Sequence, residues 1–338
     1  MNDVVLSVCI PVYNCGAYLP AALESILSQA DGRIEVVVYD GGSTDDTPQV
    51  MQAMARPGLR YIRAAARGGI DADMATCVSH AQAPHCWLFS GDDVMRPGAL
   101  ARALACIEDG ADVILCRHTI CDIDMHVLMD WVVLQPAQEA ADAQFANTPQ
   151  RHAWFARAAS TEAFFSFMSG ILVRKAAWDR GHTNPAFATS CWAHVERLLA
   201  LGQAGGLRVA YVPEIWLDQR GENDSFVHAG TVNRYRIAIE GYQAIADSLY
   251  GRDSPEAFHV RRVLRVEFTL RMFLNAKIVC AENPERESRA LLDSLYARLH
   301  SDPSPRSLAL LWAYRFTPVW AAAGLRRFIR WRRHRSVT

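Results

Sequence analysis

The stretch that decides the fold is HCWLFSGDDVMRPGAL, residues 85–100. Its apolar part, from Cys86 to Phe89, predicts a buried strand, and a Ser-Gly turn then leads to two adjacent acids, Asp92 and Asp93. Neighbouring carboxylates resist joint ionisation unless a positive group lies beside them. A divalent cation, an arginine cluster or water could supply that partner, and the residues around the stretch must decide among them.

The first 115 residues alternate short apolar runs with helical patterns, as β-α-β units do. Strands are expected at residues 6–10, 34–39, 60–62, 86–89 and 112–116, and helices at residues 18–29, 45–55, 71–82 and 97–108. The predicted fold class is therefore α/β, with a mostly parallel sheet flanked by helices.

The rest of the chain divides into a second ordered block and a helical end. Ala and Gln are frequent in residues 136–150, which predicts an exposed loop, and residues 217–230 predict a polar loop. Between them we expect strands at 167–174 and 207–212 and a helix at 191–204. Only helical patterns follow residue 231, so the expected domains are residues 1–225 and a helical region, 226–338.

Charge is distributed unevenly along the chain. Of the 338 residues, 51% are hydrophobic and 21% charged, as in globular proteins, and the formal net charge is −1. Residues 326–335 hold six arginines, so the remaining residues sum to −7. Apolar side chains alternate with these arginines, which predicts a helix lying on an anionic membrane surface; a solvated terminal helix is the alternative. The acidic body, without a recognition motif, argues against a nucleic-acid partner.

Cysteine usage and hydropathy bear on location. The nine cysteines form no C-x-x-C pair, and no apolar run reaches the length of a membrane span. The N-terminal residues predict a strand rather than a signal peptide. We therefore expect a cytoplasmic protein, peripheral on the inner face of the cell membrane.

Polar residues follow three of the expected strands, in IPVYN (10–14), YDGGSTDD (39–46) and SGDD (90–93). The carboxyl ends of parallel strands share one edge of a sheet, where ligands bind. A Gly-Gly turn with Ser and Asp is by itself most often only a turn. Three such segments at one sheet edge predict a binding site.

Four motifs in this order resemble the family 2 glycosyltransferases, which have the GT-A fold. The motifs are SVCIPVYNCGAYLPAALESILSQ (7–29), IEVVVYDGGSTDDT (34–47), GGIDADMATCVSHA (68–81) and WLFSGDDVM (87–95). The segments FMSGILVRK (167–175) and CWAHVERLL (191–199) resemble the branch that contains abequosyltransferase-type enzymes.

The resemblance implies a set of residues that bind the donor nucleotide and its sugar. By this reasoning Tyr13 stacks on the base, Asp40 bonds to base or ribose, and Asp93 binds Mg²⁺ or Mn²⁺ bridging the two phosphates. The nucleotide-binding set as a whole is Pro11, Tyr13, Asn14, Asp40, Arg67, Asp71, Asp92 and Arg220.

The general base departs from the family pattern. In many members an acidic pair precedes a helix of the second block, but here that position falls near Ser190 and Cys191. His194 has the most suitable ordinary pKa and Glu196 is the second candidate. A helical wheel puts His194 away from the buried stripe, facing a cleft or water, and an unplaced carboxylate such as Asp179 is a further alternative.

The resemblance implies an inverting, metal-dependent glycosyltransferase. It would move a sugar from a nucleotide-diphosphate donor to a saccharide acceptor, expected to be lipid-linked, in bacterial O-antigen or other surface polysaccharide synthesis. A catalytically idle nucleotide-binding scaffold is the alternative from another class, and a nucleotidyltransferase is disfavoured because the N-terminal loop lacks basic residues. Whether the C-terminal helices form a homo-oligomer is left open.

Overall fold

The structure is a computed structural model that describes residues 4–223, 229–302, 304–324 and 326–327. The chain forms two compact units, Met1–Asn223 and Asp224–Thr338, which are described in turn as the N-terminal unit and the helical unit. Most of the arginine-rich segment 326–335, on which the membrane prediction rests, lies outside the described residues.

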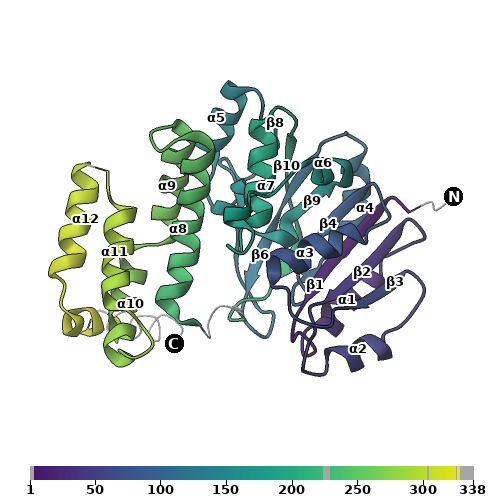
Figure 1. Cartoon of the computed structure of the whole chain (residues 1–338), viewed down its shortest axis with the longest axis horizontal. Coiled ribbons are helices and arrows are strands. Elements are labelled where there is room, and N and C mark those ends of the chain that lie inside the picture. The colour runs from purple at the N-terminus through teal and green to yellow at the C-terminus, as the bar shows by residue number, and fades with distance from the viewer. Residues whose placement is uncertain (1–3, 224–228, 303, 325, 328–338) are drawn as a thin grey trace. The chain divides into compact units, whose positions relative to one another are not determined.

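The N-terminal unit is built on one mixed sheet (Figure 1). Its first half is parallel: β3 (Leu59–Arg63), β2 (Ile34–Asp40), β1 (Leu6–Val12) and β4 (His85–Leu88) lie side by side in that order. β9 (Ile171–Arg174) then runs antiparallel between β4 and β6 (Val113–Cys121), and β6 pairs in parallel with β10 (Arg208–Gln219). Short antiparallel strands complete the sheet: β5 (Val94–Met95), β7 (Val127–Asp130) and β8 (Ala141–Gln144).

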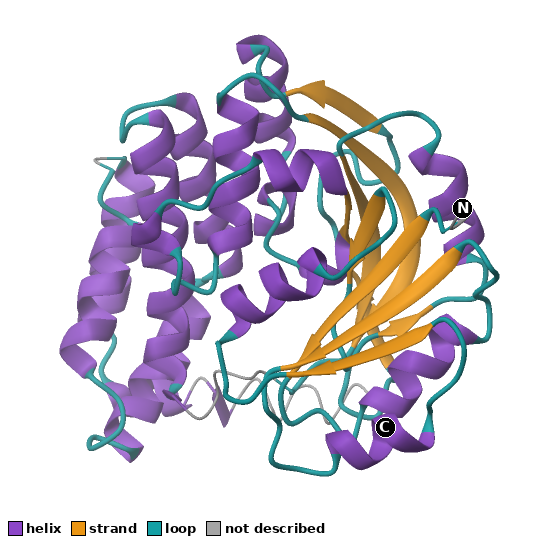
Figure 2. Cartoon of the chain, turned by 45° about the vertical axis from the view of Figure 1, so that its right-hand side comes forward, coloured by secondary structure: helices purple, strands orange, loops and turns teal. Residues whose placement is uncertain are grey.

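Helices cover both faces of this sheet (Figure 2). Alternate β1 side chains, such as Val8 and Ile10, pack in one apolar core with α1 (Leu19–Leu27), α2 (Thr47–Ala53) and α4 (Ala99–Ile107). Cys9 points the other way, towards Cys77 of α3 (Ile70–Ser79), and α3 in turn contacts α7 (Ala193–Gln203). The remaining elements of the unit are α5 (Thr148–Arg157), α6 (Lys175–Arg180), η1 (Thr161–Phe164), η2 (Met168–Gly170) and η3 (Pro185–Phe187).

The predicted α/β class and mostly parallel sheet are confirmed, one loop prediction is wrong and the other begins too early. Residues 136–150 are not a simple loop: they contain β8 and the start of α5, and the side chains of Ala143 and Phe145 are buried. β10 continues through Gln219, into the segment expected to be a polar loop. Both errors share a cause, because edge pairing to a neighbouring strand can order polar sequence that has no strong strand pattern of its own.

The helical unit contains α8 (Thr231–Tyr250), α9 (Pro255–Glu267), α10 (Leu270–Glu282), α11 (Arg289–Leu299) and α12 (Pro305–Phe316). Four of these helices begin after a Ser or Thr whose hydroxyl accepts a bond from a backbone N–H of the first turn, which satisfies an otherwise free donor. The caps are Ser254, Thr269, Ser288 and Ser304. Within the described residues this unit is helical throughout, as the sequence predicts, and none of the described helices is long and apolar enough to cross a membrane.

Candidate active site

The candidate site begins where the pairing between β1 and β4 stops. The carbonyl of Cys9 accepts from the N–H of Phe89, and the last paired residues are Cys9 and Leu88. Pro11, two residues further along β1, also directs its backbone towards β4. Because proline has no N–H to donate, the hydrogen-bond ladder between the two strands ends there. The chain segments that follow β1 and β4 can therefore diverge around a ligand.

Hydrogen bonds hold the loop after β1 against the loop after β2. The N–H of Asn14 donates to Ser43 Oγ over 2.9 Å, and Asn14 Oδ1 accepts from the N–H of Thr44 over 2.8 Å. Asp45 accepts from the N–H of Gly16 over 3.0 Å. Asn14, which has a left-handed φ of 54°, is thus a residue that joins two strand ends.

Asp40 ends β2 with no exposed surface. One oxygen accepts from the N–H of Ser43 over 2.7 Å, and the other accepts from the Tyr61 hydroxyl over 2.5 Å with Arg63 at 3.5 Å. Burial of the phenol, and next the hydrogen bond that it donates to Asp40, raise the pKa of Tyr61. Asp40 is therefore a fixed acceptor at the strand end.

Tyr13 and Arg67 lie against each other. The guanidinium of Arg67 sits 4.1 Å from the centre of the Tyr13 ring, a cation–π contact between the loop after β1 and the loop before α3. Both residues were predicted to bind the nucleotide. The face of the Tyr13 ring on which the base was predicted to stack is covered by the flexible, charged side chain of Arg67.

The two acids of the opening stretch have different surroundings. Asp92 is half-buried and accepts from the Ser90 hydroxyl and from Asn223 Nδ2, the latter over 2.9 Å. Asp93 is 2% exposed and accepts from the Ser169 hydroxyl over 2.6 Å and from the N–H of Arg220 over 3.1 Å. Burial, and next the charge of Asp92, raise the pKa of Asp93 to about 8. The buried acid is therefore poorly stabilised as an anion.

A buried ion pair lies on the other side of Asp93. His118 of β6 has no exposed surface; its Nε2 donates to Glu162 over 2.9 Å and its Nδ1 to the carbonyl of Thr119 over 3.1 Å. Burial alone would lower the pKa of His118, but Glu162 more than offsets it, so the pKa is raised. Because both ring nitrogens face acceptors, the ring is an imidazolium, and its charge opposes the rise in the pKa of Asp93.

Arg220 joins the end of β10 to this group. Its Nε donates to the carbonyl of Asp92 over 3.1 Å, and its guanidinium lies 4.8 Å from the ring centre of Tyr18. A Cβ added to Gly91 would lie 2.7 Å from Val12 Cγ1, so only glycine lets the doublet approach the end of β1 this closely. Burial first, and then Asp92, Asp45 and Asp93, raise the pKa of the nearby Cys15.

Asp71 has a different environment from the one expected of a donor-sugar ligand. Its oxygens accept from the N–H groups of Cys191 and Ala193, over 2.8 and 3.1 Å, at the start of α7. The carboxylate thus joins the first turn of α3 to the first turn of α7, where the free N–H groups of a helix favour negative charge. Burial raises its pKa in spite of these bonds.

The expectation that His194 faces away from the core is wrong. His194 is 6% exposed, and burial lowers its pKa to about 4. Glu196 is also buried and accepts from the N–H of Asn184 over 2.9 Å. The wheel assumed a helix covered on one side, but α7 is covered nearly all round, so its buried residues do not form a single stripe.

The surroundings of Asp92 and Asp93 determine whether a divalent cation fits beside them. Among the described residues no group of three or more His, Cys, Asp or Glu side chains could hold a metal by itself. Two adjacent carboxylates, one with a pKa raised to about 8, gain from a nearby cation. Mg²⁺ or Mn²⁺ needs only one or two carboxylates when substrate phosphates supply further oxygens. The residues fit that arrangement.

Sequence reasoning missed Glu162, the partner of His118, and also Ser169 and His118, which act on Asp93. They lie far from it along the chain and meet it because β9 is inserted antiparallel between β4 and β6. A Ser-Gly pair at residues 169–170 and a histidine within an apolar run were the only local signals. Asp73 was also missed; a Cβ at Gly41 would lie 2.4 Å from its carboxylate, so the Gly-Gly turn is shaped around it.

Comparison with known proteins bears on the class to which the chain belongs. The sequence model of Glycosyl transferase family 2 matches residues 7–143. Abequosyltransferase RfbV of Salmonella typhimurium is 26% identical over 306 residues, which cover 87% of this chain and 89% of that protein. An uncharacterized protein of Mycobacterium tuberculosis, MT1568, is 38% identical over 105 residues, or 31% of this chain and 33% of its own.

Solved structures show the same fold. TarS of S. aureus (residues 1–349, in complex with UDP-GlcNAc) has a TM-score of 0.59 and 16% identity, over 91% of this chain and 84% of that one. Mannosyltransferase PcManGT of Pyrobaculum calidifontis, in complex with GDP-Man and Mn²⁺, has a TM-score of 0.51 and 18% identity, over 94% and 85%. Residues 7–143 form a glycosyl transferase family 2 domain, and the chain is a glycosyltransferase.

Proposed function

We propose that the chain is an inverting, metal-dependent glycosyltransferase that takes a sugar from a nucleotide-diphosphate donor. The observation that carries the proposal is the meeting of four loops around Asp92 and Asp93. The loops after β1 and β2 bond through Asn14 and Ser43, and the end of β10 reaches both acids through Arg220. Structural neighbours solved with UDP-GlcNAc and with GDP-Man and Mn²⁺ support a donor of this class.

In this proposal the base lies on Tyr13, in place of the Arg67 guanidinium. Aromatic stacking and a fixed acceptor, Asp40, would orient the nucleoside, with Pro11 and Asn14 shaping the loop. Arg67 and Arg220, once free of their present partners, can pair with phosphate oxygens through parallel N–H groups.

Asp93 would hold Mg²⁺ or Mn²⁺, with Asp92 beside it on the donor, and the cation would supply positive charge for the leaving diphosphate. Ser169 and the N–H of Arg220 would set the orientation of the Asp93 carboxylate before substrate arrives, and the charge of His118 favours its ionised form. Inversion requires the acceptor hydroxyl to attack from the face opposite the diphosphate. We assign His194 and Glu196 to packing of α7 rather than to proton removal, because both side chains are buried and Glu196 is bonded to backbone.

The acceptor is proposed to be a lipid-linked saccharide of bacterial surface polysaccharide synthesis, O-antigen included. The similarity to an abequosyltransferase over most of the chain supports a saccharide acceptor. An exposed apolar stripe on the helical unit supports membrane docking: Leu308, Trp312 and Phe316 are spaced four residues apart on α12, and Trp320 follows. The arginines of the tail come directly after this stripe in sequence, and that combination is typical of an interfacial segment.

The proposal is tested by measuring turnover with a panel of nucleotide-diphosphate sugars (uridine, cytidine, guanosine and thymidine) and a lipid-linked saccharide acceptor. We expect hydrolysis or transfer with one base class, dependent on Mn²⁺ or Mg²⁺, with inverted anomeric configuration in the product. Nucleotide binding without turnover across the panel would instead support the catalytically idle scaffold.

A further inference from the structure

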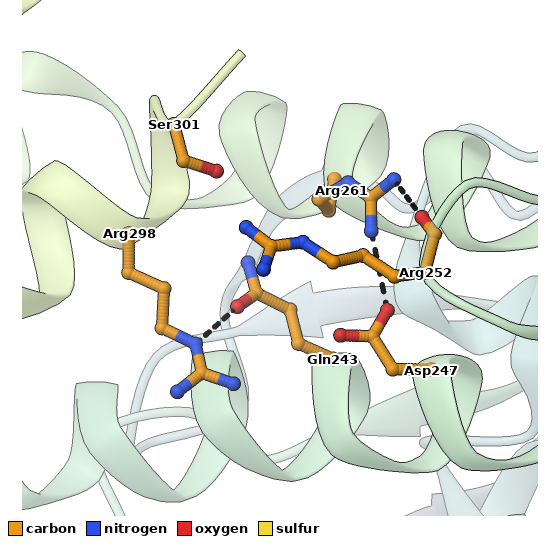
Figure 3. Close-up of a pocket in the computed structure, with 6 residues that line it drawn as sticks. All are labelled: Gln243, Asp247, Arg252, Arg261, Arg298 and Ser301. Atoms are coloured by element: carbon orange, nitrogen blue, oxygen red, sulfur yellow. Dashed lines mark hydrogen bonds and ion pairs between the residues drawn. The ribbon is translucent and has the colours of Figure 1, made fainter.

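A pocket of about 230 Å³ lies within the helical unit where α8, α9 and α11 meet (Figure 3). Its lining is polar and includes three arginines. The residues that line it are Gln243, Asp247, Arg252, Arg261, Arg298 and Ser301. They belong to the part of the chain beyond the family 2 domain, so the proposed transfer chemistry gives them no role.

Helix geometry explains why these residues meet. Gln243 and Asp247 are four residues apart on α8 and therefore share one face of it. Gly251, with φ at 86°, ends α8 in a backbone conformation that other residues rarely adopt, and the turn places Arg252 over the pocket. The carbonyl of Arg252 accepts from Arg261 Nη2 over 2.6 Å, which fixes the turn against α9.

The pocket has more positive charge than its own acid can balance. Asp247 pairs with Arg261, over 3.2 Å. Within the described parts of the chain, the Arg252 guanidinium has neither a hydrogen bond nor an ion pair, and Arg298 uses only its Nε. The formal charge of the lining is therefore +2, from three arginines and one aspartate.

Gln243 adds a buried donor without a partner. It is 3% exposed, and its Oε1 accepts from Arg298 Nε over 2.6 Å. Because Arg298 can only donate, the oxygen must face it, so the orientation of the amide is not in doubt. Among the described residues its Nε2 has no partner; it faces the Arg252 guanidinium (Figure 3), so that two donors lie together with no acceptor between them.

We propose that this pocket binds a phosphate or diphosphate group between Arg252, Arg298 and the amide of Gln243. A phosphate dianion matches the charge of +2, supplies acceptors to both guanidinium groups and satisfies Gln243 Nε2. Ser301 can donate a further hydrogen bond. The group could belong to a soluble phosphate compound or to a lipid headgroup, because both present the same oxygens.

The test is calorimetric titration of the full chain with inorganic phosphate and with pyrophosphate at constant ionic strength. We expect Arg252→Gln to weaken binding about tenfold or more, because it removes a charge-assisted contact. Arg271→Gln, at an exposed arginine on α10 outside the pocket, is the matched control and should bind as the native chain does. Equal binding by the native and Arg252→Gln chains, or no binding by the native chain, overturns the proposal.

A second variant guards against a folding artefact. Gln243→Glu keeps the shape of the side chain and its bond from Arg298, but places an acceptor beside Arg252. It should abolish phosphate binding and raise the melting temperature, since the new carboxylate takes the place of the anion. Phosphate binding that survives Gln243→Glu contradicts the proposed geometry.

Vesicles identify the source of the phosphate. Co-sedimentation with phosphatidylcholine vesicles that carry phosphatidic acid is compared for the native and Arg252→Gln chains. If the variant loses vesicle binding as well as phosphate binding, the site takes a lipid phosphate. If it loses phosphate binding only, the site takes a soluble one. Both results support the pocket, and both are independent of whether the chain transfers sugar.

Discussion

The strand-end loops of the N-terminal unit and the pocket of the helical unit are opposite solutions to phosphate recognition. The first presents acids, with Asp93 buried and its pKa raised to about 8, and is proposed to take a cation between itself and a diphosphate. The second presents three arginines and one acid around Gln243, and is proposed to bind the anion itself. Each region has charge of one sign in excess, and that sign determines the charge of the ligand proposed to bind there.

The largest expected effect comes from Asp93→Asn. It removes the charge that holds the cation, so transfer activity should fall by about 10³-fold or more, on the scale of losing a main electrostatic contact in the transition state. The unliganded variant should melt no lower than the native chain, because a neutral amide avoids the cost of a buried carboxylate. Initial rates under Mn²⁺ titration, with melting curves, separate the two effects.

Full transfer activity in Asp93→Asn would contradict the proposal that this carboxylate holds a cation. Asp92→Asn is the matched control, since Asp92 is half-buried and bonded to Ser90 and Asn223. We expect it to lose less activity than Asp93→Asn.

Two buried histidines, His194 in the N-terminal unit and His300 in the helical unit, provide a second comparison of charge in the two units. The pKa of each is lowered to about 4: for His194 by burial, and for His300 by burial and then by Arg265 and Arg306. The unfolded chain therefore binds protons first as the pH falls. The contribution of each neutral histidine to the free energy of unfolding is complete above pH ~6.5 and is lost as the pH falls towards 4. For His194 this loss is at most about 3 kcal/mol.

Replacing His194 by Phe should reduce this loss of unfolding free energy at low pH, which urea unfolding at several pH values measures. NMR titration of the rings adds a second check. Added salt should raise the pKa of His300, because arginine charge is part of its shift, and leave that of His194 nearly unchanged. Equal salt responses would contradict the charge difference between the two regions.

Tyr13→Ala tests the base-binding surface. Loss of stacking should weaken nucleotide binding by roughly 1–3 kcal/mol, mainly as a higher KM. Tyr13→Phe keeps the ring and should bind normally. An unchanged KM in Tyr13→Ala would show that the base binds elsewhere, and phosphate binding in the arginine pocket should be unaffected by either variant.

The sequence predicted the parallel half of the sheet because each strand there has a local apolar pattern and ends in a polar turn, as at Asp40 and Asp93. It predicted a strand at residues 167–174, but not that β9 pairs antiparallel between β4 and β6, which brings Ser169 and His118 to Asp93. Sequence separation hides such contacts. The placement of His194 failed because the wheel assumed one-sided burial.

The arginine pocket had no signal in sequence. Its members come from three helices and from turns after two of them, and arginines spaced this widely are usually exposed. Only the packing of α8, α9 and α11 shows that Arg252 and Arg298 share a pocket with Gln243.

The central claim is tested most directly by calorimetric titration of the native chain with nucleoside diphosphates, with and without Mn²⁺, alongside Asp93→Asn. The account predicts that one nucleoside diphosphate binds at least about tenfold more tightly with Mn²⁺, and that Asp93→Asn abolishes this gain. Nucleotide affinity that is the same with Mn²⁺ and with a chelator, or a full Mn²⁺ gain in Asp93→Asn, would contradict it.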